Sequence, residues 1–526
     1  MRNTWWITRP KRDLALVPLY LTAIANIAEG TPWRTPGKKT ELAVEANLEA
    51  EGVKTPGKRR DRGGGGARTY RSWMKGLGLA FMDDDDQFQL TLAGAALVQG
   101  APPLPILKNQ VLILKLQFPS ATAHKGLAGV HDRFQVRPAI FILQLLTDPR
   151  LGGTLAERDE VGKIATCYGT SNDQATVDDV VERILAHRKD GDASLEPDYI
   201  TKFGVTPRTP NPSMAKVVEN LGNIANTLGN WLGYSQLIIR EAGQWEITAG
   251  AEDEVKQIIQ DALDTPLIPH PDDEERFQRR FGLTPGKTKD TRRLGQDRTV
   301  TSSEVKEREI NTAFMRAAGS QIITRIDSTI IDQIATATGY PATTVEKTLA
   351  KTYPDGAVGT FMHSYAQMAF ESRDRATDFE KATASVFRDV FGFKAEHIGQ
   401  RGRVPDVVIA SDTEHYGALL DSKAYAKGYS IGISQQNRMR DYITDFPTYR
   451  LTDAPLAFFA YVVAEYKSTI NGQLKEIAET NGVPGSAITA RDIIRMVEHH
   501  QDTPYTHAQI RELLSVNRAV TYQDLS

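Results

Sequence analysis

The stretch GRVPDVVIASDTEHYGALLDSKAYAKGY at residues 402–429 contains two runs that are typical of β-strands, VPDVVIA and YGALLDSK. Asp406 lies near the start of the first run, and Asp421 lies near the end of the second. In a strand, Asp421 and Lys423 face the same side because they are two residues apart. If the two runs form a hairpin, Asp406 comes to lie beside Asp421.

Two clustered carboxylates without His or Cys favour a hard divalent cation, and Mg2+ is the expected cofactor. We expect Asp406 and Asp421 to be metal ligands, with the carbonyl oxygen of Ser422 as a further donor. Lys423 would orient or help to deprotonate a water molecule and would counter charge at a phosphate. This is the P-D…D-x-K arrangement of metal-dependent phosphodiesterases. The alternative is chance, since such carboxylates and lysines occur on neighbouring strands in many proteins.

The run DFEKATASVFRDVFGF at 378–393 predicts an amphipathic helix that precedes the two strands. Glu380, near its N-terminal end, would supply a further catalytic acid. The alternative is that Glu380 only complements the helix dipole. From about residue 356 the chain reads helix, strand, strand, helix, strand, helix, which is the order of an α/β core.

Composition narrows the class of protein. A chain of 526 residues predicts three to four domains, and 40% hydrophobic with 25% charged residues argues against wholesale disorder. The single Cys167 excludes an intramolecular disulfide and a Cys-based zinc cluster. Apolar runs are too short to span a membrane and the first residues lack a secretory signal, so we expect a cytoplasmic protein with no membrane partner. The net charge of −3 neither favours nor excludes binding to nucleic acid. That question depends on local clusters of basic residues.

The first half shows a helix followed by a β-hairpin twice. Such a helix and hairpin are the layout of a winged helix, a variant of the helix-turn-helix, although a plain β-hairpin remains possible. The stretch WLGYSQLIIREAGQWEITAGA loosely echoes WMKGLGLAFMDDDDQFQLTLAGA. The expected helices are 14–29, 41–52, 215–231 and 251–263, and the expected hairpin strands are 77–81 with 88–94 and 232–240 with 245–248.

A second helix-turn-helix candidate covers residues 157–189, with its turn at 168–171. Asn172 and Gln174 would open the second helix, where base edges are usually contacted, and their amide side chains suit adenine. The alternative is helix capping by the polar residues 171–173.

Local basic clusters are the remaining signal for DNA. Lys54 to Lys75 contains eight Lys or Arg and one acid, around four consecutive glycines, and we expect it to hold phosphates. A solvated loop is the alternative, but the interleaved Tyr70 and Trp73 favour DNA. Residues 283–303 predict a basic linker. The predicted DNA contacts here are Arg59, Arg60, Arg68, Tyr70, Arg71, Lys75, Arg292 and Arg293.

Residues 370–526 resemble the cleavage domain of the FokI group of type IIS restriction endonucleases. The resemblance rests on EKATASVFRDVFGF, EHIGQRGRVPD, YGALLDSKAYAKGY and IGISQQNRMRDYI. It implies a PD-(D/E)XK nuclease fold, with Asp406, Asp421 and Lys423 at the catalytic positions and Glu380 at the helix acid. Residues 5 to about 262 resemble the recognition half of the AlwI and BstNBI group, through WWITRP, TYRSWMKGLGLAFMDDDDQFQLTLAGAALV and RPAIFILQLL.

The resemblance also implies partners and shows one departure. FokI-like domains pair through an Asp and an Arg on the helix after the site, and these positions hold Asn437 and Asp441 here. This pair cannot make the same ion pair, which leaves room for nicking or for a different partner. The expected partners are double-stranded DNA, a second copy or a small nuclease subunit, and a cognate DNA methyltransferase.

The sequence therefore predicts a multidomain α/β protein with winged-helix recognition domains and a PD-(D/E)XK nuclease domain. The expected function is that of a Mg2+-dependent type IIS restriction endonuclease that cuts at a fixed distance outside a short asymmetric site. The alternatives are a nicking endonuclease, or the large subunit of a heterodimer, and a non-catalytic DNA-binding regulator. The expected domains are 1–145 and 146–282 for recognition, 283–355 as linker and helical connector, and 356–526 as nuclease.

Overall fold

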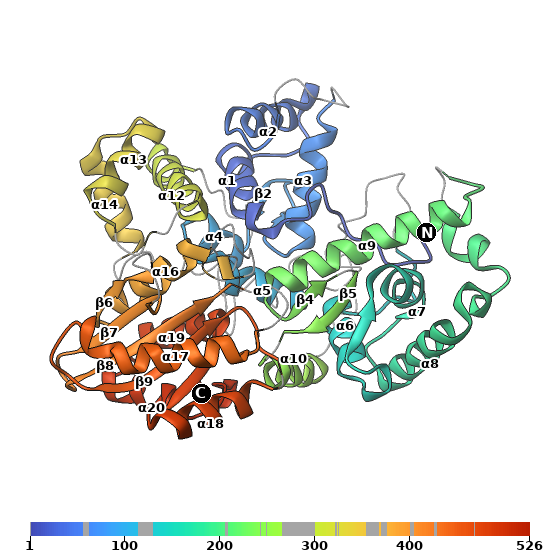
Figure 1. Ribbon diagram of the computed structural model, residues 1–526. Coiled ribbons are helices and arrows are strands. Elements are labelled where there is room, and N and C mark those ends of the chain that lie inside the picture. Colours follow the sequence, from blue (N-terminus) through green and yellow to red (C-terminus); the bar gives the residue numbers. More distant parts are fainter. Residues whose placement is uncertain are drawn as a thin grey trace. The chain divides into compact units, whose positions relative to one another are not determined.

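A computed structural model of the chain divides it into two compact units, residues 1–312 and 313–526 (Figure 1). The boundary falls within one helix, and the four sequence-based domain ranges remain predictions. The structure describes residues 2–55, 63–113, 130–205, 209–241, 243–248, 250–265, 300–320, 323, 326–353, 365, 368–369, 376–399, 404–424, 429–467 and 469–525.

The first unit is mainly helical and has one continuous hydrophobic core. Five tryptophans, from Trp5 to Trp245, are almost completely buried in it. Helix α1 has Pro18 in its first turn, where a missing amide hydrogen costs nothing. Apart from short 3-10 turns, its helices among the described residues are α1 (Val17–Ala28), α2 (Lys39–Ala50), α3 (Gly65–Gly76), α4 (Leu92–Val98), α5 (Pro103–Ile113), α6 (Pro138–Thr147), the π-helix Glu157–Ala165, α7 (Thr166–Tyr168), α8 (Gln174–Asp190), the π-helix Ile200–Gly204, α9 (Met214–Tyr234), α10 (Glu252–Asp264) and the start of α12 (Ser302–Ser320).

Both predicted hairpins of the first unit are confirmed. Strand β1 (Ala80–Met82) pairs antiparallel with β2 (Phe88–Leu90). Strand β4 (Ile238–Glu241) pairs antiparallel with β5 (Gln244–Ile247), and β5 also pairs with β3 (Thr154–Ala156), which the sequence pattern did not reveal. The winged-helix assignment of these hairpins stays a prediction.

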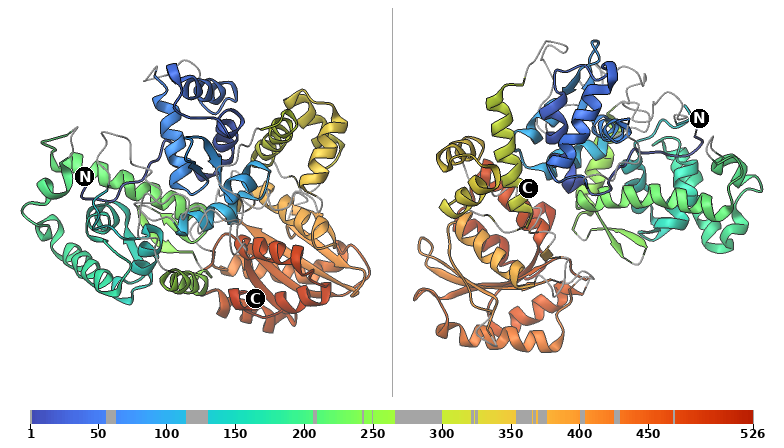
Figure 2. Two further views of the ribbon diagram at one scale, coloured as in Figure 1. Left: turned by 180° about the vertical axis from the view of Figure 1, so that it is seen from behind. Right: turned by 90° about the horizontal axis from the view of Figure 1, so that it is seen from above.

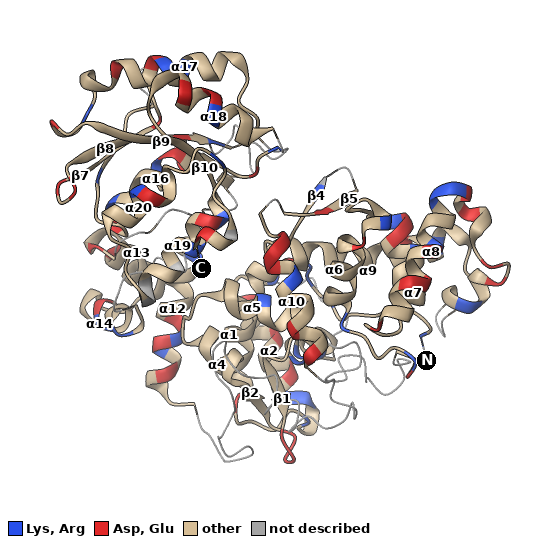
Figure 3. Cartoon of the chain, turned by 90° about the horizontal axis from the view of Figure 1, so that it is seen from below, with Lys and Arg blue, Asp and Glu red and all other residues tan. Residues whose placement is uncertain are grey.

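The tip of the first hairpin, between β1 and β2, is acidic (Figure 3). Its own hydrogen bonds organise it. One carboxylate oxygen of Asp83 accepts from the backbone amides of Asp85 and Gln87, and the other accepts from the Gln89 side chain. Asp83 therefore shapes the turn, as expected for a solvated hairpin tip.

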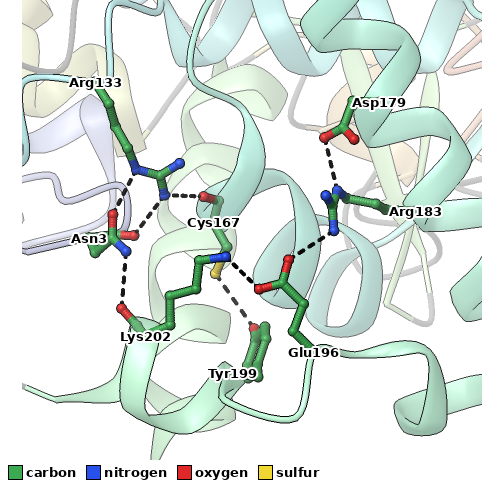
Figure 4. Close-up of polar contacts among 8 residues, drawn as sticks. All are labelled: Asn3, Arg133, Cys167, Asp179, Arg183, Glu196, Tyr199 and Lys202. Carbon is green, nitrogen blue, oxygen red and sulfur yellow. Dashed lines mark hydrogen bonds and ion pairs between the residues drawn. The ribbon is translucent and has the colours of Figure 1, made fainter.

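A polar network pins the N-terminal segment to the helices of the first unit (Figure 4). Arg133 donates to the side chain of Asn3 at 2.7 Å and to the carbonyl oxygen of Cys167 at 2.6 Å. The Cys167 thiol lies 3.5 Å from the hydroxyl of Tyr199, and burial raises the pKa of Cys167 to about 12. The thiol is therefore protonated at neutral pH and is not a reactive nucleophile.

The second unit begins with helices from the later part of the predicted connector, 283–355, and continues with an α/β domain. The connector consists of the end of α12, α13 (Ser328–Thr338) and α14 (Ala342–Thr352). A five-stranded mixed sheet follows, in the order β10-β9-β8-β7-β6. The elements of this domain are α16 (Ala376–Asp389), β6 (Lys394–His397), β7 (Val407–Ser411), β8 (Tyr416–Lys423), α17 (Ile433–Asp445), β9 (Leu456–Val463), α18 (Ile470–Asn481), β10 (Gly485–Thr489), α19 (Ala490–Asp502) and α20 (His507–Leu514).

Helices cover both faces of this sheet (Figure 2). One face packs against α16, α19 and α20, and its core includes Leu420 of β8. The opposite face packs against α17 and α18, and its core includes Leu419 of the same strand. Since neighbouring residues of a strand point to opposite faces, Asp421 and Lys423 lie on the α17 face.

No helix among the described residues combines the length and the apolar character that crossing a bilayer demands.

Candidate nuclease site

The register of the β7–β8 hairpin brings the two predicted metal ligands together. Val407 pairs with Leu420, so Asp406 and Asp421 occupy the adjoining positions at the end of the ladder. The backbone amide of Ser422 donates to Oδ2 of Asp406 at 2.7 Å. The predicted convergence of the two carboxylates is therefore present, at the centre of the sheet.

Lys423 connects both carboxylates. Its Nζ lies 2.7 Å from Oδ2 of Asp421 and 3.5 Å from Oδ2 of Asp406. Burial alone would lower the pKa of Lys423, but the two carboxylates outweigh burial and raise it. Lys423 is therefore an ammonium ion in this arrangement, so it supplies charge and hydrogen bonds and does not accept a proton.

The carboxylates fit a divalent cation. Burial, and next the charge of Asp421, raise the pKa of Asp406, which indicates negative charge that Lys423 does not fully neutralise. Oδ1 of Asp421 is buried and has no hydrogen-bond partner among the described residues. Within the same part of the chain, no group of three or more His, Cys, Asp and Glu side chains is arranged around a common point. A hard cation would therefore rest on two carboxylates, with backbone oxygens and water completing its shell.

Glu380 reaches the site from helix α16, together with a histidine that the sequence analysis missed. Oε2 of Glu380 lies 2.9 Å from Nε2 of His397, at the end of β6. The amide of Gly399 donates to the carbonyl oxygen of Asp406 at 3.2 Å. A Cβ atom on Gly399 would lie 3.2 Å from Oδ1 of Asp406 and 3.3 Å from Oε2 of Glu380. The backbone of Gly399 therefore lies close to both acids and leaves little room for a side chain.

Ser422 faces the opposite side of the sheet from its neighbours. Its buried hydroxyl lies 3.4 Å from that of Thr383 on α16. The use of its carbonyl oxygen as a metal ligand remains a prediction.

Several predicted DNA contacts lie outside the described residues, namely Arg59, Arg60, Arg292 and Arg293. Of the remaining basic residues, Arg68, Arg71 and Lys75 are partly exposed and follow one face of α3. Arg68 donates to the carbonyl oxygen of Gly63, and Arg71 stacks over the Trp33 ring at 4.7 Å.

Tyr70 corrects the expectation that the aromatic residues of this segment contact DNA. Its ring is buried and stacks on Tyr20, with 4.6 Å between centroids, and Trp73 is also buried. Helical spacing put both rings on the core face of α3, so neither presents a face to a nucleotide base.

The two amides of the helix-turn-helix candidate differ in their surroundings. The side chain of Asn172 accepts from the amide of Arg137 at 2.8 Å and donates to Gln144 at 3.0 Å, so it holds two helices together. Asp173 caps α8 by accepting from the amide of Thr176. Gln174 is exposed in the first turn of α8 and remains the better candidate for a base contact.

A cationic cluster in the N-terminal segment was not predicted. The guanidinium groups of Arg2 and Arg9 stack over the Trp6 ring at 3.9 and 4.7 Å. Burial, followed by the charges of Arg12 and Arg2, lowers the pKa of Arg9 to about 10. Arg12 is exposed and donates to the side chains of Asn223 and Asn226 at 2.6 Å. The signal was available in RNTWWITRPKR at residues 2–12, where cations lie on both sides of two adjacent tryptophans.

Asn437 and Asp441 are both exposed on α17. Arg440 lies 3.9 Å from Asp441, and Ile433, one turn before Asn437, is 78% exposed. Their role in pairing two copies stays a prediction.

Residues 339–521 match the family model of the FokI cleavage domain. This confirms the resemblance that was drawn from residues 370–526. Two curated relatives are similar to the chain. The type II restriction enzyme StsI of Streptococcus sanguinis is 22% identical over 160 residues, which cover 28% of this chain and 26% of that protein. The type II restriction enzyme FokI of Planomicrobium okeanokoites is 23% identical over 148 residues, which cover 25% of each.

The matched segment thus spans about a quarter of the length of these relatives. The chain is also similar to a solved structure of restriction endonuclease FokI, at 15% identity over 99% of this chain and 100% of that chain, with a TM-score of 0.29. A DNA complex of the BpuJ1 endonuclease binding domain matches at 14% identity over 51% and 91%, with a TM-score of 0.34. TM-scores of this size do not by themselves establish a common fold. The resemblance of the first unit to the AlwI and BstNBI group stays a prediction.

Proposed function

We propose that the chain is a type IIS restriction endonuclease, a site-specific deoxyribonuclease that binds a short asymmetric site in double-stranded DNA and cuts at a fixed distance outside it. The observation that carries this proposal is the convergence of Asp406, Asp421 and Lys423 within the segment that matches the FokI cleavage domain. Two type II restriction enzymes among the relatives support the same activity.

The proposed chemistry is hydrolysis of a phosphodiester bond. A Mg2+ ion held by Asp406 and Asp421 would supply positive charge to the phosphate and to the attacking oxygen. Lys423, which remains an ammonium ion beside both carboxylates, stabilises negative charge that develops on the phosphate. Glu380, which contacts His397 and lies near Asp406, would supply a further acid to the site from α16.

The first unit is the proposed DNA-recognition part, with its two hairpins as wings. Arg68, Arg71 and Lys75 on α3 are candidate phosphate contacts. The cluster of Arg2, Arg9 and Arg12 is a second candidate phosphate-binding site, because a phosphate group stabilises cations that lie close together. Gln174 is the candidate base contact.

The proposed setting is a cytoplasmic restriction system. A cognate DNA methyltransferase is the expected partner, because an unprotected host genome would otherwise be cut. A second copy of the chain or a small nuclease subunit would provide the cut in the second strand, since one such site cuts one strand.

The test is incubation of the purified chain with supercoiled plasmid, with Mg2+ or with EDTA, followed by sequencing of the product ends. We expect Mg2+-dependent linear fragments whose ends lie at a constant offset from one motif. If no cleavage occurs on several unmethylated plasmids, the endonuclease proposal fails and a non-catalytic DNA-binding regulator takes its place.

A nicking endonuclease is the second candidate, and the Asn437–Asp441 pair on α17 favours it. An exposed Asn and Asp at these positions cannot form the reciprocal ion pair of an Asp and an Arg. Products that stop at open circles in the same assay would select this candidate over double-strand cleavage.

A further inference from the structure

A buried tyrosine lies beside the catalytic carboxylate on the neighbouring strand. In the parallel pairing of β8 with β9, Tyr461 is the direct partner of Asp421. Both side chains therefore point to the α17 face of the sheet. Tyr461 is completely buried, and its ring lies 5.5 Å from that of Tyr429.

Two polar atoms of this pair lack hydrogen-bond partners among the described residues. Oδ2 of Asp421 is bound to Lys423, but Oδ1 of Asp421 and the hydroxyl of Tyr461 have no partner. Buried polar groups in folded proteins are almost always hydrogen-bonded. Two such atoms on paired residues, next to a candidate cation site, are therefore available to a bound ion and its water molecules.

The chemistry of the side chain agrees with this geometry. A tyrosine hydroxyl keeps its proton at neutral pH and is a hydrogen-bond donor. Phe459 lies two residues earlier in β9 on the same face, but its ring has no hydrogen-bond donor. Of these two residues, Tyr461 is the one that can donate a hydrogen bond.

We propose that Tyr461 is a positioning residue whose hydroxyl donates a hydrogen bond to a water molecule in the shell of the Mg2+ ion at Oδ1 of Asp421. This inference rests on the proposed function, in which Asp406 and Asp421 hold that ion. Mg2+ retains several water molecules when it binds to proteins, and donors to the outer shell orient those waters.

The test is Tyr461→Phe in the full chain, which removes only the hydroxyl. Isothermal titration with Mg2+ should show affinity reduced about 10-fold to 100-fold. The Mg2+ concentration for half-maximal cleavage should rise by a similar factor, whereas the KM for DNA stays unchanged. A purely structural hydroxyl predicts a different result, since its removal from a buried site would raise the melting temperature without Mg2+ and leave Mg2+ affinity alone.

Tyr416→Phe is the matched control, because Tyr416 is a buried tyrosine of β8 on the opposite face whose hydroxyl donates to the carbonyl oxygen of His507. Its Mg2+ affinity should equal that of the wild type. Asp421→Asn separates the two proposals. If Asp421→Asn loses Mg2+ binding but Tyr461→Phe does not weaken it, the role of Tyr461 is overturned and the nuclease site stands. If Asp421→Asn binds Mg2+ and cleaves normally, the proposed metal site at Asp406 and Asp421 itself fails, and the role of Tyr461 fails with it.

Discussion

The backbone amide of Ser422 donates a 2.7 Å hydrogen bond to Oδ2 of Asp406. The donor lies between Asp421 and Lys423 in β8, whereas the acceptor precedes β7. Through this bond, strand β8, which carries Asp421 and Lys423, also fixes the position of the Asp406 carboxylate. The main chain preorganises the site, so loss of a single functional side chain should impair chemistry without disturbing the fold.

Asp421→Ala and Lys423→Ala should each reduce cleavage at least about 100-fold and leave site binding intact. The reason is that both remove charge from the reacting centre and neither changes the first unit. Plasmid cleavage and an electrophoretic mobility shift with the recognition site measure the two effects.

Asp412→Ala is the control for these variants, because Asp412 lies in the turn between the same strands and forms an exposed ion pair with Lys394. It should cleave like the wild type. If a folded Asp421→Ala protein no longer bound the site, recognition and catalysis would not be divided between the two units as proposed.

Gly399→Ala should lower the cleavage rate roughly 10-fold. The new methyl group would contact Asp406 and Glu380 at distances that are tighter than ordinary van der Waals contact, so the two acids must move apart. Single-turnover cleavage rates measure the effect. Gly472→Ala is the control, since a Cβ there meets no atom within 4 Å. Equal rates for the two variants would show that the spacing of the acids does not limit cleavage.

The stability of the metal-free protein should depend on pH through Asp406. Burial and the charge of Asp421 raise the pKa of this carboxyl in the folded state. A group of this kind contributes stability that is complete below its unfolded-state pKa and is lost as pH rises through the folded-state pKa. We expect the melting temperature of the wild type, relative to Asp406→Asn, to fall between about pH 4 and about pH 8. A difference that stays constant with pH would contradict the assignment.

Arg12→Gln should weaken DNA binding and reduce the slope of log affinity against log salt concentration by about 0.9, the loss of one phosphate contact. Among the described residues, the side chain of Arg12 donates to the neutral amides of Asn223 and Asn226, which leaves its charge available to an anion. Fluorescence anisotropy over a salt series measures the slope.

Arg150→Gln provides the comparison, because Arg150 already lies within 4 Å of Asp148, Asp178 and Glu182. Its salt slope should match the wild type. If both variants changed the slope equally, the N-terminal cluster would have no special role in phosphate binding.

The sequence by itself was sufficient for the local features of this protein. Two short apolar runs predicted the strands of the β7–β8 hairpin, and the spacing of Asp421 and Lys423 predicted that both lie on one face. The helices of the connector and both hairpins of the first unit were also predicted, since helical and strand periodicities are properties of short segments. The resemblance to the FokI cleavage domain rests on contiguous motifs of the same kind.

Only the tertiary structure decided which distant residues join the site. His397, Gly399 and Tyr461 reach Asp406 and Asp421 through strand pairing and through the packing of α16, and no local pattern encodes those contacts. Tyr70 shows the converse, because its place between basic residues suggested DNA whereas helix packing buried it against Tyr20. Periodicity identifies which face of a helix or strand is apolar. Which other element packs against that face depends on burial between residues that are distant in sequence, and therefore on the whole chain.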